Sequence, residues 1–205
     1  MEESKTVSIT VLVPAGRLPL DIMEAASKLA SEYSFGIYLS TAQNLRLIDV
    51  PADAADAIKA QLAELGADFK GPGKHLGPRV CIGKGNCNLG VIDTAELSRK
   101  IVERCAGREK YKAKLKTAIS GCTMCCSNVK TTDIGVMATR EGYEVFAGGK
   151  GGPFPKVAIR IEKTADEERV LDIVEQLVEF HDSKTATKQR MYKLLNDPDF
   201  PFAEV

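Results

Sequence analysis

The cysteines of this 205-residue chain constrain its fold more than any other feature. Five of the six fall in two tight clusters separated by 34 residues, and the stretch around the first cluster is rich in glycine. A chain of this length buries an adequate core without disulfide staples, and its acidic first residues are unlike an export signal. We therefore predict a cytoplasmic protein whose clustered thiols are ligands rather than disulfides. The clusters are Cys81 and Cys87, then Cys122, Cys125 and Cys126.

The cysteine spacing indicates which metal chemistry the thiols can serve. The first pair reads C-x5-C, and the second cluster contains a C-x3-C pair formed by Cys122 and Cys126. Structural zinc sites favour pairs with about two to four intervening residues, which the first pair does not satisfy. Four thiolates on glycine-rich loops suit an iron–sulfur cluster better, and a zinc-stabilised binding module is the alternative. Cys105 stands alone on a predicted helix face, where a buried free thiol is the simplest interpretation.

Hydrophobic periodicity predicts an α+β fold. The first 70 residues show the order strand, helix, strand, strand, helix, which indicates a small sheet with helices on one face. A loop-rich stretch over 70–90 follows, and helices and strands then alternate around the second cysteine cluster. The elements expected there are a helix over 93–105, a strand over 112–119, a hairpin over 134–147, a strand over 157–161, and helices over 166–180 and 187–195.

Charge is balanced overall but unevenly distributed. The 28 basic and 28 acidic residues give a formal net charge of zero, which argues against nucleic-acid binding, and no apolar run is long enough to span a membrane. Three windows between consecutive acidic residues, 69–92, 110–132 and 145–161, nevertheless hold four, five and three basic residues. They predict a positive pocket for small anions, with the candidate side chains Arg79, Lys84, Lys130 and Lys150. A solvated strand face is the simpler interpretation for the alternating Lys110, Lys112, Lys114 and Lys116.

Several short motifs occur in a fixed order along the chain. Residues 40–45 read Ser-Thr-Ala-Gln-Asn-Leu directly after a predicted strand, and the cysteines then give C-x5-C followed by G-C-x3-C. Asp-Ile-Gly-Val at 133–136, Gly-Tyr at 142–143 and Gly-Gly at 148–149 come next. This combination resembles the nitrite/sulfite reductase family, with its sirohaem and 4Fe-4S signature and its T-x-x-Q-N-L element, across nearly the whole chain.

The resemblance implies a fold and two coupled cofactors. It implies a ferredoxin-like half domain over residues 1–70, followed by an α+β domain over 71–205 that binds a 4Fe-4S cluster and sirohaem. Four thiolates would hold the cluster, and the last of them, Cys126, would also bridge to the sirohaem iron. The implied metal ligands are Cys81, Cys87, Cys122 and Cys126, and the implied sirohaem contacts are Thr41, Gln43, Asn44, Cys126, Gly149 and Lys150.

The resemblance also implies an activity, the reduction of a small oxyanion. Reduction of sulfite to sulfide is the expected reaction, and nitrite is the other substrate that the family implies. The basic candidates Arg79, Lys84, Lys130 and Lys150 would hold the anion and relay protons. The chain lacks the glycine motifs of nucleotide sites, so its electrons would come from a separate donor such as ferredoxin.

Three departures from the family pattern matter. Most full-length relatives contain two such halves, whereas this chain has one, so we expect a homodimer that covers the exposed side of the macrocycle. Ala42 stands where a first half usually carries an arginine that faces the substrate. A non-catalytic electron-transfer or sirohaem-binding protein is therefore the alternative function. Cys125 adds a thiol beside Cys126 and so provides a second candidate for the fourth cluster ligand.

Overall fold

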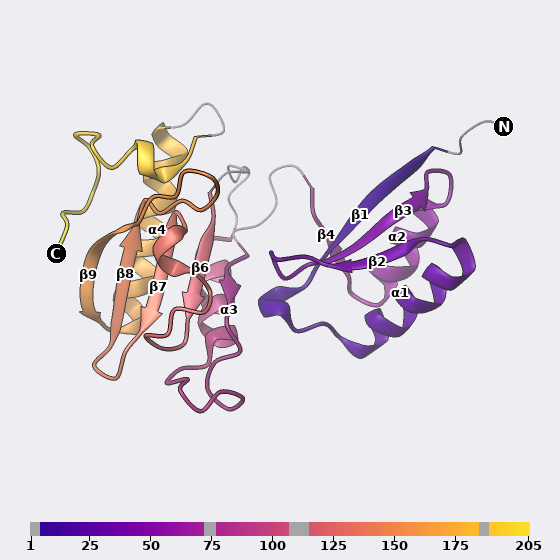
Figure 1. Ribbon diagram of the computed structural model, residues 1–205, viewed down its shortest axis with the longest axis horizontal. Coiled ribbons are helices and arrows are strands. Elements are labelled where there is room, and N and C mark those ends of the chain that lie inside the picture. Colours follow the sequence, from indigo (N-terminus) through magenta and orange to yellow (C-terminus); the bar gives the residue numbers. More distant parts are fainter. Residues whose placement is uncertain (1–4, 72–76, 107–114, 185–188) are drawn as a thin grey trace. The chain divides into compact units, whose positions relative to one another are not determined.

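The computed structural model describes residues 5–71, 77–106, 115–184 and 189–205. The chain divides into two compact units, unit 1 over residues 1–71 and unit 2 over residues 72–205. Figure 1 shows that each unit combines helices with its own β-sheet. None of the helices in the described ranges is long and apolar enough to cross a membrane.

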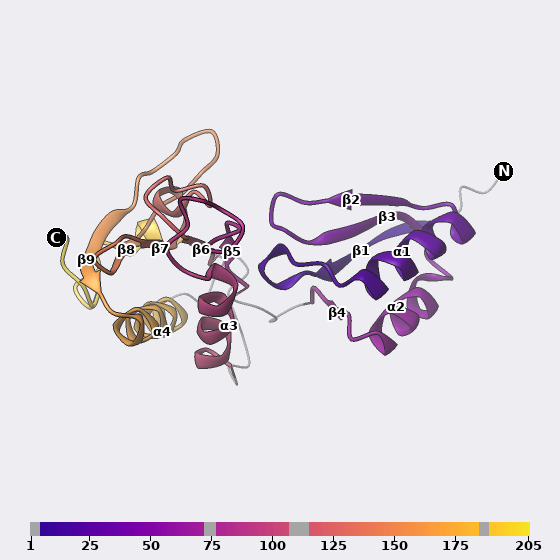
Figure 2. The same cartoon turned by 90° about the horizontal axis from the view of Figure 1, so that it is seen from below.

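Unit 1 is a four-stranded antiparallel sheet with the strand order β2-β3-β1-β4. Figure 2 shows both helices of the unit on one face of this sheet. The order strand, helix, strand, strand, helix agrees with the prediction from periodicity, and a two-residue fourth strand is added at the edge. The elements are β1 (Thr6–Leu12), η1 (Pro14–Gly16), α1 (Leu20–Tyr33), β2 (Gly36–Leu39), β3 (Leu45–Pro51), α2 (Ala55–Glu64) and β4 (Asp68–Phe69).

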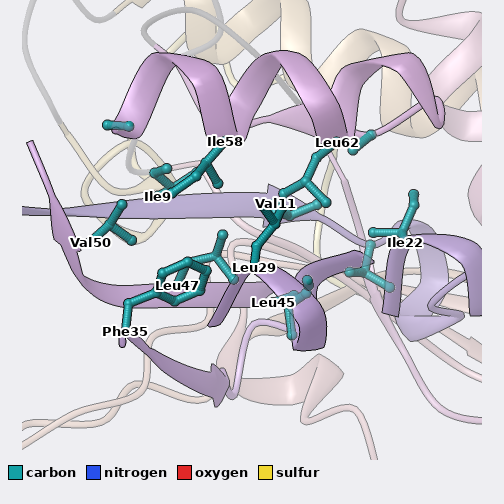
Figure 3. Packing of buried hydrophobic residues seen from close by; sticks show 14 residues of the cluster. Ile9, Val11, Ile22, Leu29, Phe35, Leu45, Leu47, Val50, Ile58 and Leu62 are labelled. Carbon is teal, nitrogen blue, oxygen red and sulfur yellow. The ribbon is translucent and has the colours of Figure 1, made fainter. Parts of the chain in front are cut away.

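Alternation along the strands creates the core of unit 1 (Figure 3). Side chains on successive strand residues point to opposite faces, so Ile9 and Val11 of β1 face the helices together with Leu47 of β3. The helices contribute residues spaced by three or four positions, such as Ile58 and Leu62 of α2, which are fully buried. The sheet and helices thus share one apolar layer.

Unit 2 contains a five-stranded mixed sheet with the order β5-β6-β7-β8-β9. Strands β5, β6 and β7 are parallel, whereas β7, β8 and β9 are antiparallel. Figure 2 shows α3 and α4 side by side on one face of the sheet. The elements are β5 (Arg79–Val80), α3 (Thr94–Arg104), β6 (Thr117–Ser120), η2 (Val129–Thr131), β7 (Ile134–Ala138), β8 (Tyr143–Ala147), β9 (Ile159–Ala165), α4 (Glu167–Lys184) and η3 (Met191–Lys193).

Three expected elements of unit 2 differ from the structure. The strand expected over 157–161 begins at Ile159 and continues to Ala165. The strand expected over 112–119 begins only at Thr117; residues 112–114 lie outside the described ranges, and Lys116 is exposed just before β6. The helix expected over 187–195 is wrong, because its described part contains only the short turn η3. The physical reason is a pair of side-chain and backbone hydrogen bonds from Arg190 and Met191 to Asp133, which hold Arg190 in an extended conformation.

Candidate functional site

The two cysteine loops leave the sheet of unit 2 at the same edge. Cys81 directly follows β5, and Cys122 follows β6 by two residues. Val80 pairs with Ile119 in a parallel register, so the carboxyl ends of these strands are neighbours. The backbone N–H of Gly121 donates a hydrogen bond to the Cys81 sulfur, at a nitrogen–sulfur distance of 3.1 Å. The fold therefore joins the two clusters, which are far apart in the sequence.

Three glycines allow the backbone to pack closely, both within the first cysteine loop and between the two loops. A Cβ atom on Gly90 would lie only 2.6 Å from the backbone of Gly83 and Lys84. A Cβ atom on Gly121 would lie 3.2 Å from the Gly83 Cα and 3.4 Å from the Cys81 sulfur. A side chain at Gly90 would force the first loop open, and a side chain at Gly121 would crowd the first loop from the second. We call Gly83, Gly90 and Gly121 the glycine cradle.

A helix cap holds the cradle against the sheet. The side chain of Asp93 accepts hydrogen bonds from the backbone N–H groups of Ala95 and Glu96 and so caps α3. The next residue, Thr94, is only 1% exposed and donates its hydroxyl hydrogen to the Cys81 carbonyl oxygen at 2.5 Å. Our sequence analysis missed this contact. Its signal was the Asp-Thr pair at the start of a predicted helix, because such residues favour caps.

The structure distinguishes the two adjacent cysteines of the second loop. Cys125 packs against an apolar cluster on the sheet and has a positive φ of 58°. Cys126 is exposed. The Cys126 thiol is thus accessible to a ligand, whereas the Cys125 thiol is engaged in packing. The apolar cluster consists of Ala118, Val129, Met137, Phe146 and Ala158.

The cysteine loops have features that suit an iron–sulfur cluster. Hydrogen bonds to cluster sulfurs and close approach of glycine backbone are expected at such sites, and the Gly121–Cys81 contact and the glycine cradle provide both. Cys81, Cys87 and Cys122 are half-buried, and Cys105 is buried as expected. Within the described ranges, no three Cys, His, Asp or Glu side chains converge as ligands of a metal ion. The structure therefore positions the loops without closing the four thiols into one set.

The four basic candidates have different surroundings. Arg79 donates two hydrogen bonds to the Ser127 carbonyl oxygen, at 3.1 and 2.7 Å, so its guanidinium group holds the loop that follows Cys126. Lys84 is exposed, and its backbone nitrogen lies against Gly90 of the glycine cradle. The sequence alone did not distinguish the hydrogen-bonded Arg79 from the exposed Lys84, since both residues are cations close to a cysteine.

Lys130 and Lys150 lie on neighbouring segments of unit 2. The Lys130 ammonium group lies 5.5 Å from the centre of the Phe146 ring. The Lys150 ammonium group lies 5.6 Å from the centre of the Tyr192 ring and donates a hydrogen bond to the Phe154 carbonyl oxygen. Gly149 connects these segments, because a Cβ atom there would lie 2.8 Å from the Lys130 carbonyl oxygen. The structure thus brings Lys130, Gly149 and Lys150 together.

The motif at 40–45 forms the turn between β2 and β3 in unit 1. Backbone hydrogen bonds between Ser40 and Asn44 and from Gln43 to Ser40 close this turn, and Gln43 has a positive φ of 61°. Gln43 and Asn44 line a cavity of about 170 Å³, whereas Thr41 is exposed. Pockets for drug-sized ligands have volumes of roughly 300–1,000 Å³. This cavity alone is therefore too small to enclose a macrocycle, although it can accept a peripheral group.

The fold and the site define an α+β protein with a ferredoxin-like half domain followed by a domain of cysteine loops. The model of the nitrite/sulfite reductase ferredoxin-like half domain matches residues 1–65. The model of the nitrite and sulphite reductase 4Fe-4S domain matches residues 73–200. The chain belongs to the nitrite/sulfite reductase family, a family of oxidoreductases that is associated with sirohaem. The resemblance and the fold class inferred from the sequence are confirmed.

Curated relatives are named as both sulfite and nitrite reductases. The assimilatory-type sulfite reductase of Nitratidesulfovibrio vulgaris is 23% identical over 93% of this chain and 87% of its own length. The large subunit of the NADH nitrite reductase of Escherichia coli is 26% identical over 92% of this chain. This chain covers only 22% of that subunit, so it spans about a fifth of the nitrite reductase.

Solved structures support the same fold. The NirA protein of Mycobacterium tuberculosis matches 92% of this chain with a TM-score of 0.77 and 19% identity. Dissimilatory sulfite reductase I matches 90% of this chain with a TM-score of 0.71. This chain covers 38% of the first protein and 65% of the second.

Proposed function

We propose that this protein is a sirohaem- and 4Fe-4S-dependent reductase of a small oxyanion. Sulfite is the preferred candidate substrate, and nitrite is the alternative. One observation carries the proposal. The cysteine loops of a chain from this family meet at a single sheet edge and are held there by the glycine cradle. Sulfite would lose its oxygen atoms as water, taking electrons from an external reduced carrier such as ferredoxin and protons from solvent.

Different residues of the chain would bind the cluster and the sirohaem. Cys81, Cys87, Cys122 and Cys126 would hold the cluster, which supplies electrons when it is bound. We assign the fourth position to Cys126 rather than Cys125, because Cys126 is exposed and Cys125 packs in the apolar cluster. Thr41, Gln43, Asn44 and Gly149 would contact the sirohaem.

The basic residues would attract the anion and orient it. Lys84, Lys130 and Lys150 carry ammonium groups outside the core and can hold a negative charge in place. Arg79 would act mainly through the loop that it binds, since its guanidinium group donates hydrogen bonds to Ser127 and Thr132. A non-catalytic electron-transfer or sirohaem-binding protein is the second candidate, favoured by Ala42 at the place of the substrate-facing arginine.

The reductase proposal is tested first by cofactor content. Protein reconstituted anaerobically with iron, sulfide and sirohaem should bind one 4Fe-4S cluster per chain only when the cysteines are intact. Iron and acid-labile sulfide analysis, together with the visible absorption spectrum, measures the cluster content. Cys126→Ser should lose the cluster, and the adjacent Cys125→Ser is the matched control that should keep it. The reverse result would contradict the ligand assignment, and bound zinc without iron would contradict the cluster.

Turnover separates the two candidate functions. The loaded protein is mixed with a reduced viologen dye, and the oxidation of the dye is followed after addition of sulfite or of nitrite. Oxidation that depends on sulfite supports the reductase. An intact cluster and sirohaem without oxidation by either anion would support the electron-transfer protein instead.

We further propose a cytoplasmic homodimer with domains at 1–70 and 71–205. A second copy would cover the side of the macrocycle that a single half leaves exposed, and two-fold dimers are the commonest oligomers. Light scattering of cofactor-loaded protein at micromolar concentration measures the mass. A particle of the 22.2 kDa monomer mass that still reduces sulfite would contradict the dimer.

A further inference from the structure

A buried carboxylate in unit 2 binds the segment that follows α4. Asp133 is 0% exposed and lies directly before β7. One of its oxygens accepts hydrogen bonds from Arg190 Nε at 2.8 Å and from the Met191 backbone N–H at 3.0 Å. Its other oxygen accepts from the Lys116 backbone N–H at 3.0 Å. The Met191 side chain is itself fully buried. The segment around η3 is therefore held by the side chains of Arg190 and Met191 and by the Met191 backbone N–H group.

The same residues fix the glycine loop that precedes Lys150. The backbone N–H of Gly148 donates to the Asp133 carbonyl oxygen at 2.8 Å. The Arg190 Nη2 atom donates to the Gly149 carbonyl oxygen at 3.3 Å. The loop and the η3 segment are therefore held to one another through Asp133 and Arg190.

The contacts of Lys150 follow from this arrangement. Its backbone pairs with Lys156 in both directions, which closes the loop over 150–156. Its ammonium group meets the face of the Tyr192 ring and a carbonyl oxygen of Phe154. Both of these partners are uncharged, so neither of them supplies a counter-ion to the lysine. Tyr192 is placed beside Lys150 because Arg190 and Met191, immediately before it, are anchored on Asp133.

We propose that Asp133, Arg190 and Tyr192 are positioning residues that set where the Lys150 ammonium group lies. The proposal rests on the proposed function in one respect, that Lys150 binds the anionic substrate. Asp133 and Arg190 fix the backbone on both sides, and the Tyr192 ring holds the ammonium group by a cation–π contact. Within residues 130–133, 148–156 and 190–193 the remaining charged residues are Lys130, Lys156 and Lys193, all of them positive, and the first acid after them is Asp197.

The test reads the position of Lys150 directly. Reductive methylation with carbon-13 formaldehyde labels lysines and keeps their charge, and the Lys150 signal is assigned by its disappearance in Lys150→Arg. The nearby ring should shift this signal upfield in the wild type and in Tyr192→Phe, which retains an aromatic face. Tyr192→Leu should remove the shift. Arg190→Gln should also remove or broaden it, and Arg190→Lys should restore part of it.

Sulfite titration of the same labelled protein connects position to binding. A cation–π contact at such a site is worth about a two- to fivefold change in an equilibrium, so Tyr192→Leu should raise the sulfite dissociation constant measured at Lys150 about two- to fivefold. Tyr192→Phe should match the wild type. If Tyr192→Leu leaves the Lys150 signal unmoved while the fold is intact, the positioning proposal is overturned. If that signal moves as expected but sulfite never perturbs Lys150 in the wild type, positioning stands and the proposed anion role of Lys150 fails.

Discussion

The glycine cradle makes a sharp prediction about Gly90. Its backbone φ is not in the left-handed region, so an alanine at this position would cause no backbone strain. Steric overlap of the new Cβ atom with its neighbours is the cost of the substitution. The added Cβ atom would lie 2.6 Å from two backbone atoms, whereas ordinary van der Waals contact begins near 3.4 Å. The first cysteine loop must therefore open by about 0.8 Å between Gly90 and the peptide that joins Gly83 to Lys84. The atoms in the way belong to the backbone of Gly83 and Lys84 and cannot rotate aside.

This separation is large on the scale of a ligand site. Binding constellations must be held within roughly 0.5 Å of their working geometry, and overpacking costs typically about 1–3 kcal/mol. Cys81 and Cys87 lie on the loop that would move. We expect Gly90→Ala to lose most of its iron after anaerobic reconstitution, while the cluster-free protein loses about 1–3 kcal/mol of unfolding free energy in urea.

Gly77→Ala is the matched control, because Gly77 has no atom within 4 Å of its missing Cβ and an ordinary φ. It should keep its iron and its stability. Circular dichroism of both variants verifies that they are folded. Equal iron content in Gly90→Ala and Gly77→Ala would refute the view that the cradle sets the positions of the thiols.

Three further predictions concern stability. Leu47→Ala, at a fully buried position between the sheet and helices of unit 1, should cost about 2–5 kcal/mol in urea unfolding. Burial raises the pKa of Asp133, against the opposing effect of Arg190. The stability that the protonated Asp133 contributes to the fold is therefore fully present below pH about 4 and is lost as the pH rises through the raised pKa. Over that range the unfolding free energy of the wild type should fall relative to that of Asp133→Asn. Arg104 pairs with three acids of α4, so Arg104→Gln should lower the thermal midpoint slightly, and salt should shrink the difference between the midpoints of wild type and variant.

Local patterns predicted most of the elements because those elements depend on local periodicity. The alternation in β1 and the spacing of Ile22, Ala26 and Leu29 in α1 are visible in the sequence, and the structure buries those residues. The hairpin of β7 and β8 was likewise predicted. The failures lie where distant residues decide. The described part of 187–195 has helix-compatible residues, but hydrogen bonds to Asp133, 57 residues away, determine its conformation.

The sequence predicts which residue types the candidate site contains, but not how the fold assembles them. Spacing singles out the cysteines as candidate ligands, since ligand chemistry leaves a pattern in sequence. It did not identify the contact of Gly90 with Gly83, because loop paths depend on tertiary packing rather than on local propensity. Arg79 illustrates the same limit. A cation beside a cysteine suggests anion binding, yet the structure places its guanidinium group on the Ser127 carbonyl oxygen.

The segment from Gly121 to Thr132 links the cysteine loops to the lysine loop. It leaves the carboxyl end of β6 and enters the amino end of β7, at the opposite end of the sheet, because the two strands are parallel. Val129 lies on the sheet directly over Gly135, where a Cβ atom would meet the Val129 carbonyl oxygen at 2.3 Å.

Gly135 pairs with Ala118 and Phe146, and this row alternates with Ile119, Val136 and Val145 along the strands. The two rows therefore point to opposite faces, and the segment occupies the face opposite α3 and α4 (Figure 2). Cys125 is one of its contacts with the sheet, and Lys130 is near its end. A substitution that lifts this segment from the sheet would thus move Cys126 and Lys130 together. For this reason the proposed cluster ligand Cys126 and the proposed anion-binding residue Lys130 belong to one structural unit rather than to two independent sites.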